Sequence, residues 1–142
     1  MRILIVDDQP LGIDVLQARI QEAEPTYQIE GANTAIEATH LALVAQPPFD
    51  VYLIDQNLGT MPTGIDLLLE LRQASPRSDA IVFTGFGDPE EGQRAIDAGA
   101  CDYFTKPLDY PRLFAQLRRL QQERSTRNER NWLAALAEGT IE

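Results

Sequence analysis

Two kinds of hydrophobic pattern alternate along the chain. Short apolar runs lie at residues 3–6, 51–54 and 80–83, a weaker alternating run lies at residues 27–31, and another short run lies at residues 101–104. Between these runs, apolar residues recur at helical spacing. Short continuous apolar runs are typical of strands buried on both faces, as in parallel sheets. The pattern therefore predicts five strand–helix units.

Each segment between or after the strands has one apolar stripe that we expect to face the core. The predicted stripes are Leu11, Val15, Leu16 and Ile20; Ala35, Ile36, Leu41, Leu43 and Val44; Ile65, Leu68, Leu69 and Leu71; Ala95, Ile96 and Ala98; and Leu113, Phe114, Leu117 and Leu120. Pro10 and Pro89 suit the first turn of a helix, and Asp88 suits the N-cap before Pro89. Gly99 suits a helix C-terminus.

The order of these elements predicts an α/β fold. Right-handed crossovers between parallel strands place helices on both faces of the sheet. We predict a doubly wound five-stranded parallel sheet in the flavodoxin-like order 2-1-3-4-5. Residues 1–120 are expected to form this domain, and residues 121–142 a C-terminal helical extension or linker.

Composition narrows the class of protein. The chain has 142 residues, of which 44% are hydrophobic, enough for one domain with a proper core. No stretch approaches about 18 consecutive apolar residues, so no membrane span is expected. The single cysteine excludes an internal disulfide and fits a cytoplasmic protein.

The net charge of −10 argues against nonspecific binding of nucleic acid. Residues 1–110 hold 18 acidic and 6 basic side chains, whereas residues 111–142 hold 4 acidic side chains and 6 arginines. One interpretation is that the acidic part and the arginine-rich tail have different roles. The other is that the arginines merely solvate an exposed helix. No DNA-binding helix-turn-helix pattern is visible.

Polar residues follow four of the predicted strands. Asp7 and Asp8 follow the first, Asp55 the third and Thr84 the fourth, while Lys106 lies just beyond the fifth. Ligands of such sheets bind at the carboxyl ends of the strands. We therefore expect three carboxylates, one hydroxyl and one ammonium group to converge there.

Three neighbouring carboxylates repel one another, and a hard divalent cation relieves the repulsion. Mg²⁺ prefers oxygen ligands, and the single histidine and single cysteine offer no cluster for zinc or copper. Lys106 is the only lysine, a compact charge suited to phosphoryl oxygens. The chemistry that fits is phosphoryl transfer to a carboxylate, with Asp55 as the nucleophile.

Five segments in this order resemble the receiver domain of two-component response regulators: "ILIVDDQP", "DVYLIDQNL", "MPTGIDLL", "IVFTGFGD" and "AGACDYFTKPLD". The resemblance covers about residues 1–120. It implies that Asp55 is the phosphoacceptor, and that Thr84 and Lys106 contact the phosphoryl group. It also implies a Mg²⁺ site with Asp55 and the backbone carbonyl of Asn57 among its ligands. Asp8 would bind the ion directly, and Asp7 would position it or act through water.

The resemblance implies a signalling switch, not a turnover enzyme. A histidine kinase or phosphotransfer protein would donate the phosphoryl group. Tyr103 would rotate inward when Thr84 moves, and would alter the surface formed by the fourth helix, fifth strand and fifth helix. An output domain or a second copy of the chain would bind that surface or the tail.

The chain departs from the family after Asp55. Gly64 comes one residue later than the corresponding glycine usually does, so we expect a longer loop between Asp55 and Gly64. The longer loop leaves Asp55 and Asn57 in place, but it changes the entrance to the site. Phe86, two residues after Thr84, adds a bulky apolar side chain at the rim.

Two other functions use the same architecture. A Mg²⁺-dependent phosphatase would use the carboxylate of Asp55, but such enzymes generally need a second acid two residues on, where this chain has Asn57. A flavin or nucleotide module would need a glycine-rich loop after the first strand, whereas this chain has the acidic Asp7-Asp8-Gln9-Pro10.

Apolar residues return near the C-terminus after a polar stretch at residues 121–131. We expect the last helix to continue past Leu120, and Trp132, Leu133 and Leu136 to make an intermolecular or interdomain contact. Either the chain is a stand-alone regulator, or it is part of a longer protein.

Overall fold

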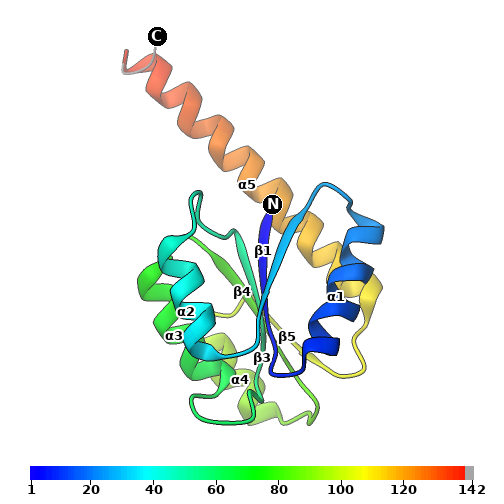
Figure 1. Ribbon diagram of the computed structural model, residues 1–142. Helices are drawn as coiled ribbons and strands as arrows, with labels where there is room; N and C mark the ends of the chain where they lie inside the picture. The colour runs from blue at the N-terminus through cyan, green and yellow to red at the C-terminus, as the bar shows by residue number, and fades with distance from the viewer. Residues whose placement is uncertain (140–142) are drawn as a thin grey trace. The chain divides into compact units, whose positions relative to one another are not determined.

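A computed structural model of the chain describes residues 1–139. The chain divides into two compact units, Met1–Asp109 and Tyr110–Glu142, the last three residues of which lie outside the described part (Figure 1).

The first unit is built on one sheet of five parallel strands. They are β1 (Arg2–Val6), β2 (Gln28–Ala32), β3 (Val51–Asp55), β4 (Asp79–Thr84) and β5 (Asp102–Thr105). Their order, β2-β1-β3-β4-β5, confirms the prediction. In the register of the sheet, Val6 pairs with Ile54 and Asp55 with Phe83, so the ends of the central strands lie level with one another.

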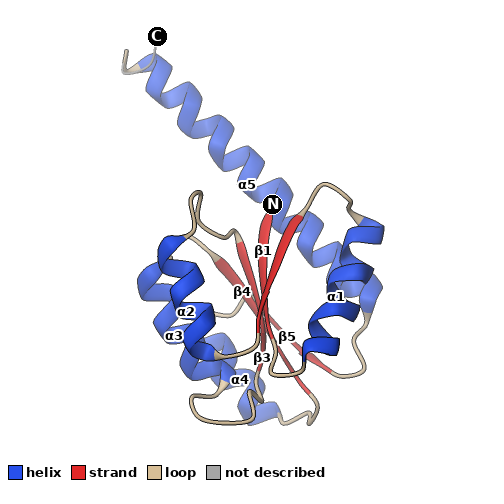
Figure 2. Ribbon diagram, viewed as in Figure 1, coloured by secondary structure: helices blue, strands red, loops and turns tan. Residues whose placement is uncertain are grey.

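Four helices cover this sheet. They are α1 (Pro10–Ala23), α2 (Ala35–Val44), α3 (Gly64–Ala74) and α4 (Pro89–Asp97). Helix α1 lies on one face of the sheet, and α2, α3 and α4 lie on the other (Figure 2). Pro10 and Pro89 occupy the first turns of α1 and α4, and the Asp88 side chain accepts a hydrogen bond from the Glu90 N–H at 2.9 Å, as predicted.

Alternate residues of the central strands fill the two sides of the core. Leu4, Tyr52 and Ile54 join one buried cluster with residues of α2 and α3. Ile3 and Leu53 are equally buried but lie outside that cluster, because successive strand residues point to opposite faces. Burial on both faces explains why these strands read as continuous apolar runs.

The predicted apolar face of α1 was partly wrong. The buried residues are Ile13, Leu16 and Ile20, whereas Leu11 is 73% and Val15 is 47% exposed. The predicted and the observed sets both contain Leu16 and Ile20 at helical spacing. The hydrophobic pattern alone therefore does not decide which other residues are buried. The sheet decides, because β2 brings Gly31 against Ile13: a Cβ atom at Gly31 would lie 2.5 Å from Ile13 Cγ2.

The predicted face of α2 was also wrong in its large residues. Ala38 and Ala42 are buried, whereas Ile36, Leu43 and Val44 are exposed. Small side chains allow a helix to approach its neighbours closely, so this helix buries alanines and leaves larger apolar side chains outside. Smaller errors affect the later helices. Leu69 and Ile96 are exposed, and Leu67, which was not predicted, is buried, whereas Ala95 is buried as predicted.

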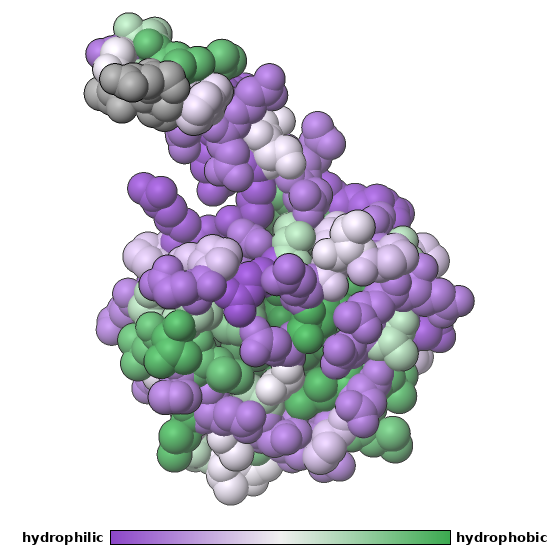
Figure 3. Space-filling model, turned by 45° about the horizontal axis from the view of Figure 1, so that its top comes forward, coloured by the Kyte–Doolittle hydropathy of each residue, from purple (hydrophilic) through white to green (hydrophobic). Residues whose placement is uncertain are grey.

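The second unit contains one helix, α5 (Tyr110–Ala137). Leu113, Leu117 and Leu120 are buried, and the remaining apolar residue of the predicted stripe, Phe114, is half-buried. Trp132, Leu133 and Leu136 are about half exposed, at 51%, 56% and 41%. Residues 121–131, which precede this apolar end of the helix, are polar, and hydrophilic side chains adjoin the end in the space-filling view (Figure 3).

A search of residues 1–139 finds no helix that combines the length and the apolar composition needed to cross a membrane.

Candidate functional site

The polar residues predicted from the strand ends lie together at the carboxyl edge of the sheet. Asp7 directly follows β1, Asp55 is the last residue of β3, and Thr84 is the last residue of β4. All three are only 4% exposed. Lys106 follows β5, and its backbone N–H donates to the Thr84 carbonyl at 2.7 Å. This hydrogen bond places the lysine beside the ends of β3 and β4.

Asp7, Asp8 and Asp55 form one acidic cluster. One carboxylate oxygen of each lies within 4.8 Å of the others. Within residues 1–139, this is the only group of three or more acidic, histidine or cysteine residues close enough to share a metal ion. Asp8 is half-buried, so the cluster is open on that side.

Backbone N–H groups orient two of these carboxylates. Gln9 N–H donates to Asp7 Oδ1, and Asn57 N–H donates to Asp55 Oδ1, both at 2.9 Å. Burial raises the pKa of Asp7, and the charges of Asp55 and Asp8 raise it further, against the lowering effects of the Gln9 N–H and of Lys106. The fold thus holds an acid where its charged form is disfavoured.

Lys106 supplies the positive charge of the site. Its Nζ lies 2.7 Å from Asp55 Oδ2, and its side chain is 40% exposed. Burial lowers the pKa of Lys106, but the hydrogen bond and charge of Asp55, followed by the charges of Asp7 and Asp8, outweigh burial and raise it overall. The Lys106–Pro107 peptide bond is cis.

The loop between β3 and α3 folds back onto the acidic cluster. Asn57 Oδ1 accepts a hydrogen bond from Gly59 N–H at 2.9 Å, and Gly59 has a φ of 80°. A Cβ atom at Gly59 would lie 2.8 Å from Asp8 Oδ2. At the far end of the loop, a Cβ atom at Gly64 would lie 2.3 Å from the backbone oxygen of Asp55. Both glycines therefore permit close approaches to the site.

Thr84 bonds the segment after β4, and Tyr103 bonds α4. Thr84 Oγ1 accepts a hydrogen bond from Phe86 N–H at 3.3 Å. Tyr103, in the middle of β5, donates its hydroxyl hydrogen to Glu91 Oε1 at 2.7 Å. Phe86 is 82% exposed, as expected for a residue at the rim.

Two residues of this arrangement were not predicted from the sequence. An acid in the first turn suits the positive end of a helix dipole, and nothing in the spacing of Glu91 points to Tyr103. Gly59 stood in a loop whose path was unknown. A glycine two residues after Asn57 is a turn signal, which could have predicted a residue with positive φ.

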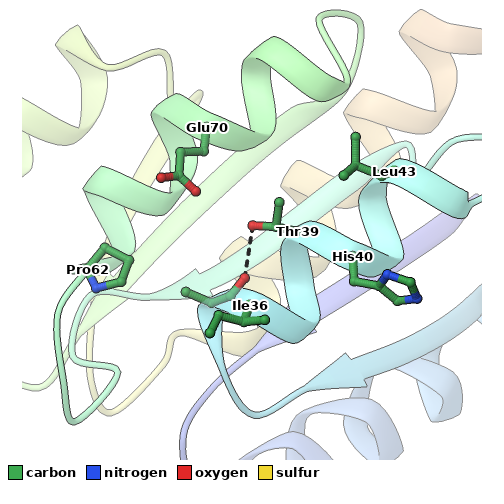
Figure 4. A pocket seen from close by; sticks show the side chains of 7 residues that line it. Ile36, Thr39, His40, Leu43, Pro62 and Glu70 are labelled. Carbon is green, nitrogen blue, oxygen red and sulfur yellow. Dashed lines mark hydrogen bonds between the residues drawn. The ribbon is translucent and has the colours of Figure 1, made fainter.

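The surface of this unit also has open hollows. One, of about 400 Å³, is a groove between α2 and α3, lined by Ala35, Ile36, Thr39, His40, Leu43, Pro62 and Glu70 (Figure 4). It shares no residue with the acidic cluster. A hollow of about 280 Å³ is formed by the β3–α3 loop itself and includes Asn57 and Gly59. The loop hollow therefore adjoins the acidic cluster, whereas the groove is a separate surface.

The donor set fits a hard divalent cation. Three carboxylates meet with only one ammonium group hydrogen-bonded to them, so the negative charge exceeds the positive charge. Oxygen-only donors, some buried and one half-buried, match the preference of Mg²⁺ for a few carboxylates and several waters. The cluster can hold a cation and present Asp55 to a phosphoryl group.

Known proteins are similar to this chain in sequence and in fold. A model of the response regulator receiver domain family matches residues 3–118. The transcriptional regulatory protein ZraR of Salmonella typhimurium (strain LT2) is 35% identical over 111 residues, which are 78% of this chain and 24% of that protein. The transcriptional regulatory protein KdpE of Mycobacterium tuberculosis (strain H37Rv) is 37% identical over 116 residues, 82% of this chain and 49% of that protein.

A solved structure gives the same result. The crystal structure of a CheY-like response regulator receiver domain protein from Methanospirillum hungatei JF-1 has a TM-score of 0.74 and 29% identity, and the match covers 88% of this chain and 97% of that one.

The curated relatives are longer than this chain, which spans about a quarter of ZraR and half of KdpE. The comparisons do not support the alternative of a Mg²⁺-dependent phosphatase. Because the family match extends over most of the chain and the strand order agrees with it, the chain belongs to the receiver domains of two-component response regulators.

Proposed function

We propose that this domain is a phosphorylation switch in which Asp55 accepts a phosphoryl group from a phosphohistidine. One observation carries the proposal: the Asp55 carboxylate lies at the end of a buried strand, within 4.8 Å of two other carboxylates and 2.7 Å from Lys106 Nζ. A nucleophilic carboxylate between a cation site and an ammonium group suits attack on a phosphoryl group, whose own charge needs neutralising.

In the transfer, a carboxylate oxygen of Asp55 forms a bond to phosphorus as the bond from phosphorus to the imidazole nitrogen breaks. The electron pair of that bond leaves with the imidazole. The product is an acyl phosphate on Asp55. The Asn57 N–H holds the carboxylate in place, because its hydrogen bond to Oδ1 fixes the plane of the group.

Asp7, Asp8, Asp55 and the backbone carbonyl of Asn57 would hold Mg²⁺. When bound, the ion offsets the negative charge of the phosphoryl oxygens and of the carboxylates. Asp8 is the more exposed of the two acids after β1 and suits direct coordination. Asp7 is buried and hydrogen-bonded to the Gln9 N–H, which suits a role in positioning.

Lys106 and Thr84 are the residues that would contact the new phosphoryl group. Lys106 already lies on Asp55 Oδ2, so it needs only a small shift to reach a phosphoryl oxygen. The Thr84 hydroxyl, at the end of the neighbouring strand, would donate to another oxygen. A movement of Thr84 would then change the position of Tyr103. This change would shift an existing conformational equilibrium of the surface formed by α4 and β5.

The partners follow from this chemistry. A histidine kinase or a phosphotransfer protein would supply the phosphohistidine, and the switched surface or the tail would bind an output domain or a second copy of the chain. ZraR and KdpE are both named transcriptional regulatory proteins, which supports an output in transcription for a longer protein containing this domain.

Radiolabelled acetyl phosphate with Mg²⁺ tests the proposal without knowledge of the kinase. We expect the wild-type chain to become labelled, because the carboxylate can displace acetate from the small donor. Asp55→Asn should lose the label. Asp14→Asn is the matched control, since it removes an exposed carboxylate from α1 outside the cluster. Equal labelling of Asp55→Asn and the wild type would contradict the proposal.

A further inference from the structure

Helix α4 has a direct polar link to Tyr103. Tyr103 lies in the middle of β5, and its hydroxyl donates a hydrogen bond of 2.7 Å to Glu91 Oε1, in the first turn of α4. Both residues are half-buried. An ionised carboxylate is a stronger acceptor than a neutral group, so this bond is stronger than an ordinary tyrosine–backbone contact.

The ring of Tyr103 also packs against the backbone of α4. A Cβ atom at Gly92 would lie 3.0 Å from Tyr103 Cδ1 and 3.2 Å from Cε1. The absence of a side chain at Gly92 therefore lets the ring lie directly on the helix. Glu91 fixes the end of the ring and Gly92 accommodates its edge.

Thr84 ends β4, the strand that pairs with β5. Burial, then the hydrogen bond and charge of Glu91, raise the pKa of Tyr103 to about 12, against the lowering effects of hydrogen bonds with the Thr84 side chain and the Asp88 backbone. At neutral pH the phenol is therefore protonated and able to donate to Glu91. Tyr103 and Glu91 thus form a polar link from β5 to α4.

We propose that Glu91 is a positioning residue of the switch: its carboxylate holds the Tyr103 ring against α4, so that a movement of Thr84 is passed to this helix at Glu91. The inference rests on the proposed function, because a phosphoryl group on Asp55 supplies the movement of Thr84. It adds a specific residue of α4 that receives the signal.

Removal of the acceptor should free the ring. A hydrogen bond to a charged group that is only half-buried is worth roughly a tenfold change in an equilibrium, so Glu91→Ala should shift the ring toward other positions by about that factor. Glu91→Gln keeps the shape of the side chain and an acceptor oxygen but loses the charge, and should fall between the wild type and Glu91→Ala.

The test uses the full chain labelled with ¹³C at the tyrosine ζ carbons, together with ¹⁵N-labelled backbone. The Tyr103 signal is assigned by its disappearance in Tyr103→Phe, which separates it from the other three tyrosines. We expect Glu91→Ala to move this signal. Glu90→Ala is the matched control, since it removes an exposed acid from the same helical turn, and should leave the signal unchanged.

The second measurement follows the amide signals of α4 when acetyl phosphate and Mg²⁺ are added. In wild type and Glu90→Ala we expect signals of Thr84 and of residues 89–97 to move together. In Glu91→Ala and in Tyr103→Phe the Thr84 signal should still move, but the response of α4 should fall severalfold. The double variant should respond like either single variant, because both remove the same link.

Two failures are distinguishable. If Asp55 is labelled normally and Glu91→Ala behaves like Glu90→Ala in both measurements, Glu91 has no role in the switch, although the proposed function stands. If acetyl phosphate fails to label Asp55 in the wild type, the proposed function fails first, and the role of Glu91 in passing on the signal fails with it.

Discussion

At the scale of single residues, the site is an electrostatic compromise. Asp7 and Asp55 are almost fully buried beside Asp8, and Lys106 offsets only part of their charge. Burial of charged groups costs free energy unless they are paired or bound to a metal ion. The acidic cluster should therefore lower the stability of the domain when no cation is bound. Function, and not stability, requires the three carboxylates.

Asp7→Asn tests this cost. The pKa of Asp7 is raised by burial and by neighbouring charges, so the folded protein binds this proton more tightly than the unfolded chain does. The stability that the bound proton contributes is complete below the usual pKa near 3.8, and is lost as the pH rises through the higher pKa of the folded state. At neutral pH with EDTA, Asp7→Asn should therefore be more stable than the wild type.

Urea unfolding at neutral pH and near pH 4 measures the difference. The Asp7→Asn side chain keeps an oxygen for the Gln9 N–H, so the variant isolates the charge. We expect the advantage of Asp7→Asn to shrink toward pH 4. Asp14→Asn should show neither effect. A lower stability of Asp7→Asn at neutral pH in EDTA would show that the Asp7 charge stabilises the fold.

At the scale of elements, the loop between β3 and α3 completes the site. Its backbone passes so close to Asp8 that a side chain at Gly59 would touch the carboxylate. Thr63 then begins α3 with a capping box, in which its side chain accepts from Asp66 N–H and the Asp66 side chain accepts from Thr63 N–H. The loop therefore follows an ordered path between two fixed points, Asp55 and α3.

Gly59→Ala should disturb this path. A φ of 80° disfavours residues with a Cβ atom by about 1–2 kcal/mol, and the new methyl group would press on Asp8 Oδ2. We expect lower stability and weaker Mg²⁺ binding, measured by urea unfolding and by titration calorimetry. Thr60→Ala, at the next exposed position, should change neither property much. Unchanged Mg²⁺ affinity in Gly59→Ala would show that the loop does not shape the cation site.

The strands and the acidic cluster could be predicted from the sequence because both depend on local signals. A strand buried on both faces reads as a continuous apolar run, and residues that follow parallel strands must meet at one edge of the sheet. Asp7, Asp55 and Thr84 could therefore be placed without coordinates. Lys106 could be placed because its strand neighbours β4.

The buried helix faces and the link from Tyr103 to Glu91 could not be predicted. Leu11 and Ile13 both fit a helical stripe with Leu16, and only the position of β2 selects Ile13. In α2 the preference for large apolar residues was misleading, because close packing buries Ala38. The hydrogen bond between Tyr103 and Glu91 joins a strand to the helix that precedes it. The hydrophobic periodicity of the sequence does not indicate polar contacts between two different elements.

At the scale of the whole molecule, charge and apolar surface are unevenly distributed. Residues 1–110 carry the acidic excess, whereas residues 111–142 hold six arginines and the exposed Trp132, Leu133 and Leu136. An apolar cluster separated from the rest of the apolar residues of α5 by a polar stretch suits a contact with another chain or domain. We propose that these three residues make such a contact.

Trp132 reports on this contact directly, since it is the only tryptophan in the chain. If two copies associate through the end of α5, tryptophan emission should shift to shorter wavelength as the protein concentration rises, and sedimentation velocity should show a larger species. Leu133→Ala combined with Leu136→Ala should reduce both effects. Emission and sedimentation that stay constant over the whole concentration range would exclude association of the chain with itself.

The central claim is that Asp55 forms an acyl phosphate. The most direct measurement treats the Mg²⁺-loaded chain with acetyl phosphate, reduces it with borohydride, and locates the product by peptide mass spectrometry. Reduction converts an aspartyl phosphate to homoserine, so we predict homoserine at position 55 and unmodified aspartate at positions 7 and 8. Homoserine at another aspartate, or none in a chain that carries the phosphoryl label, would contradict the claim.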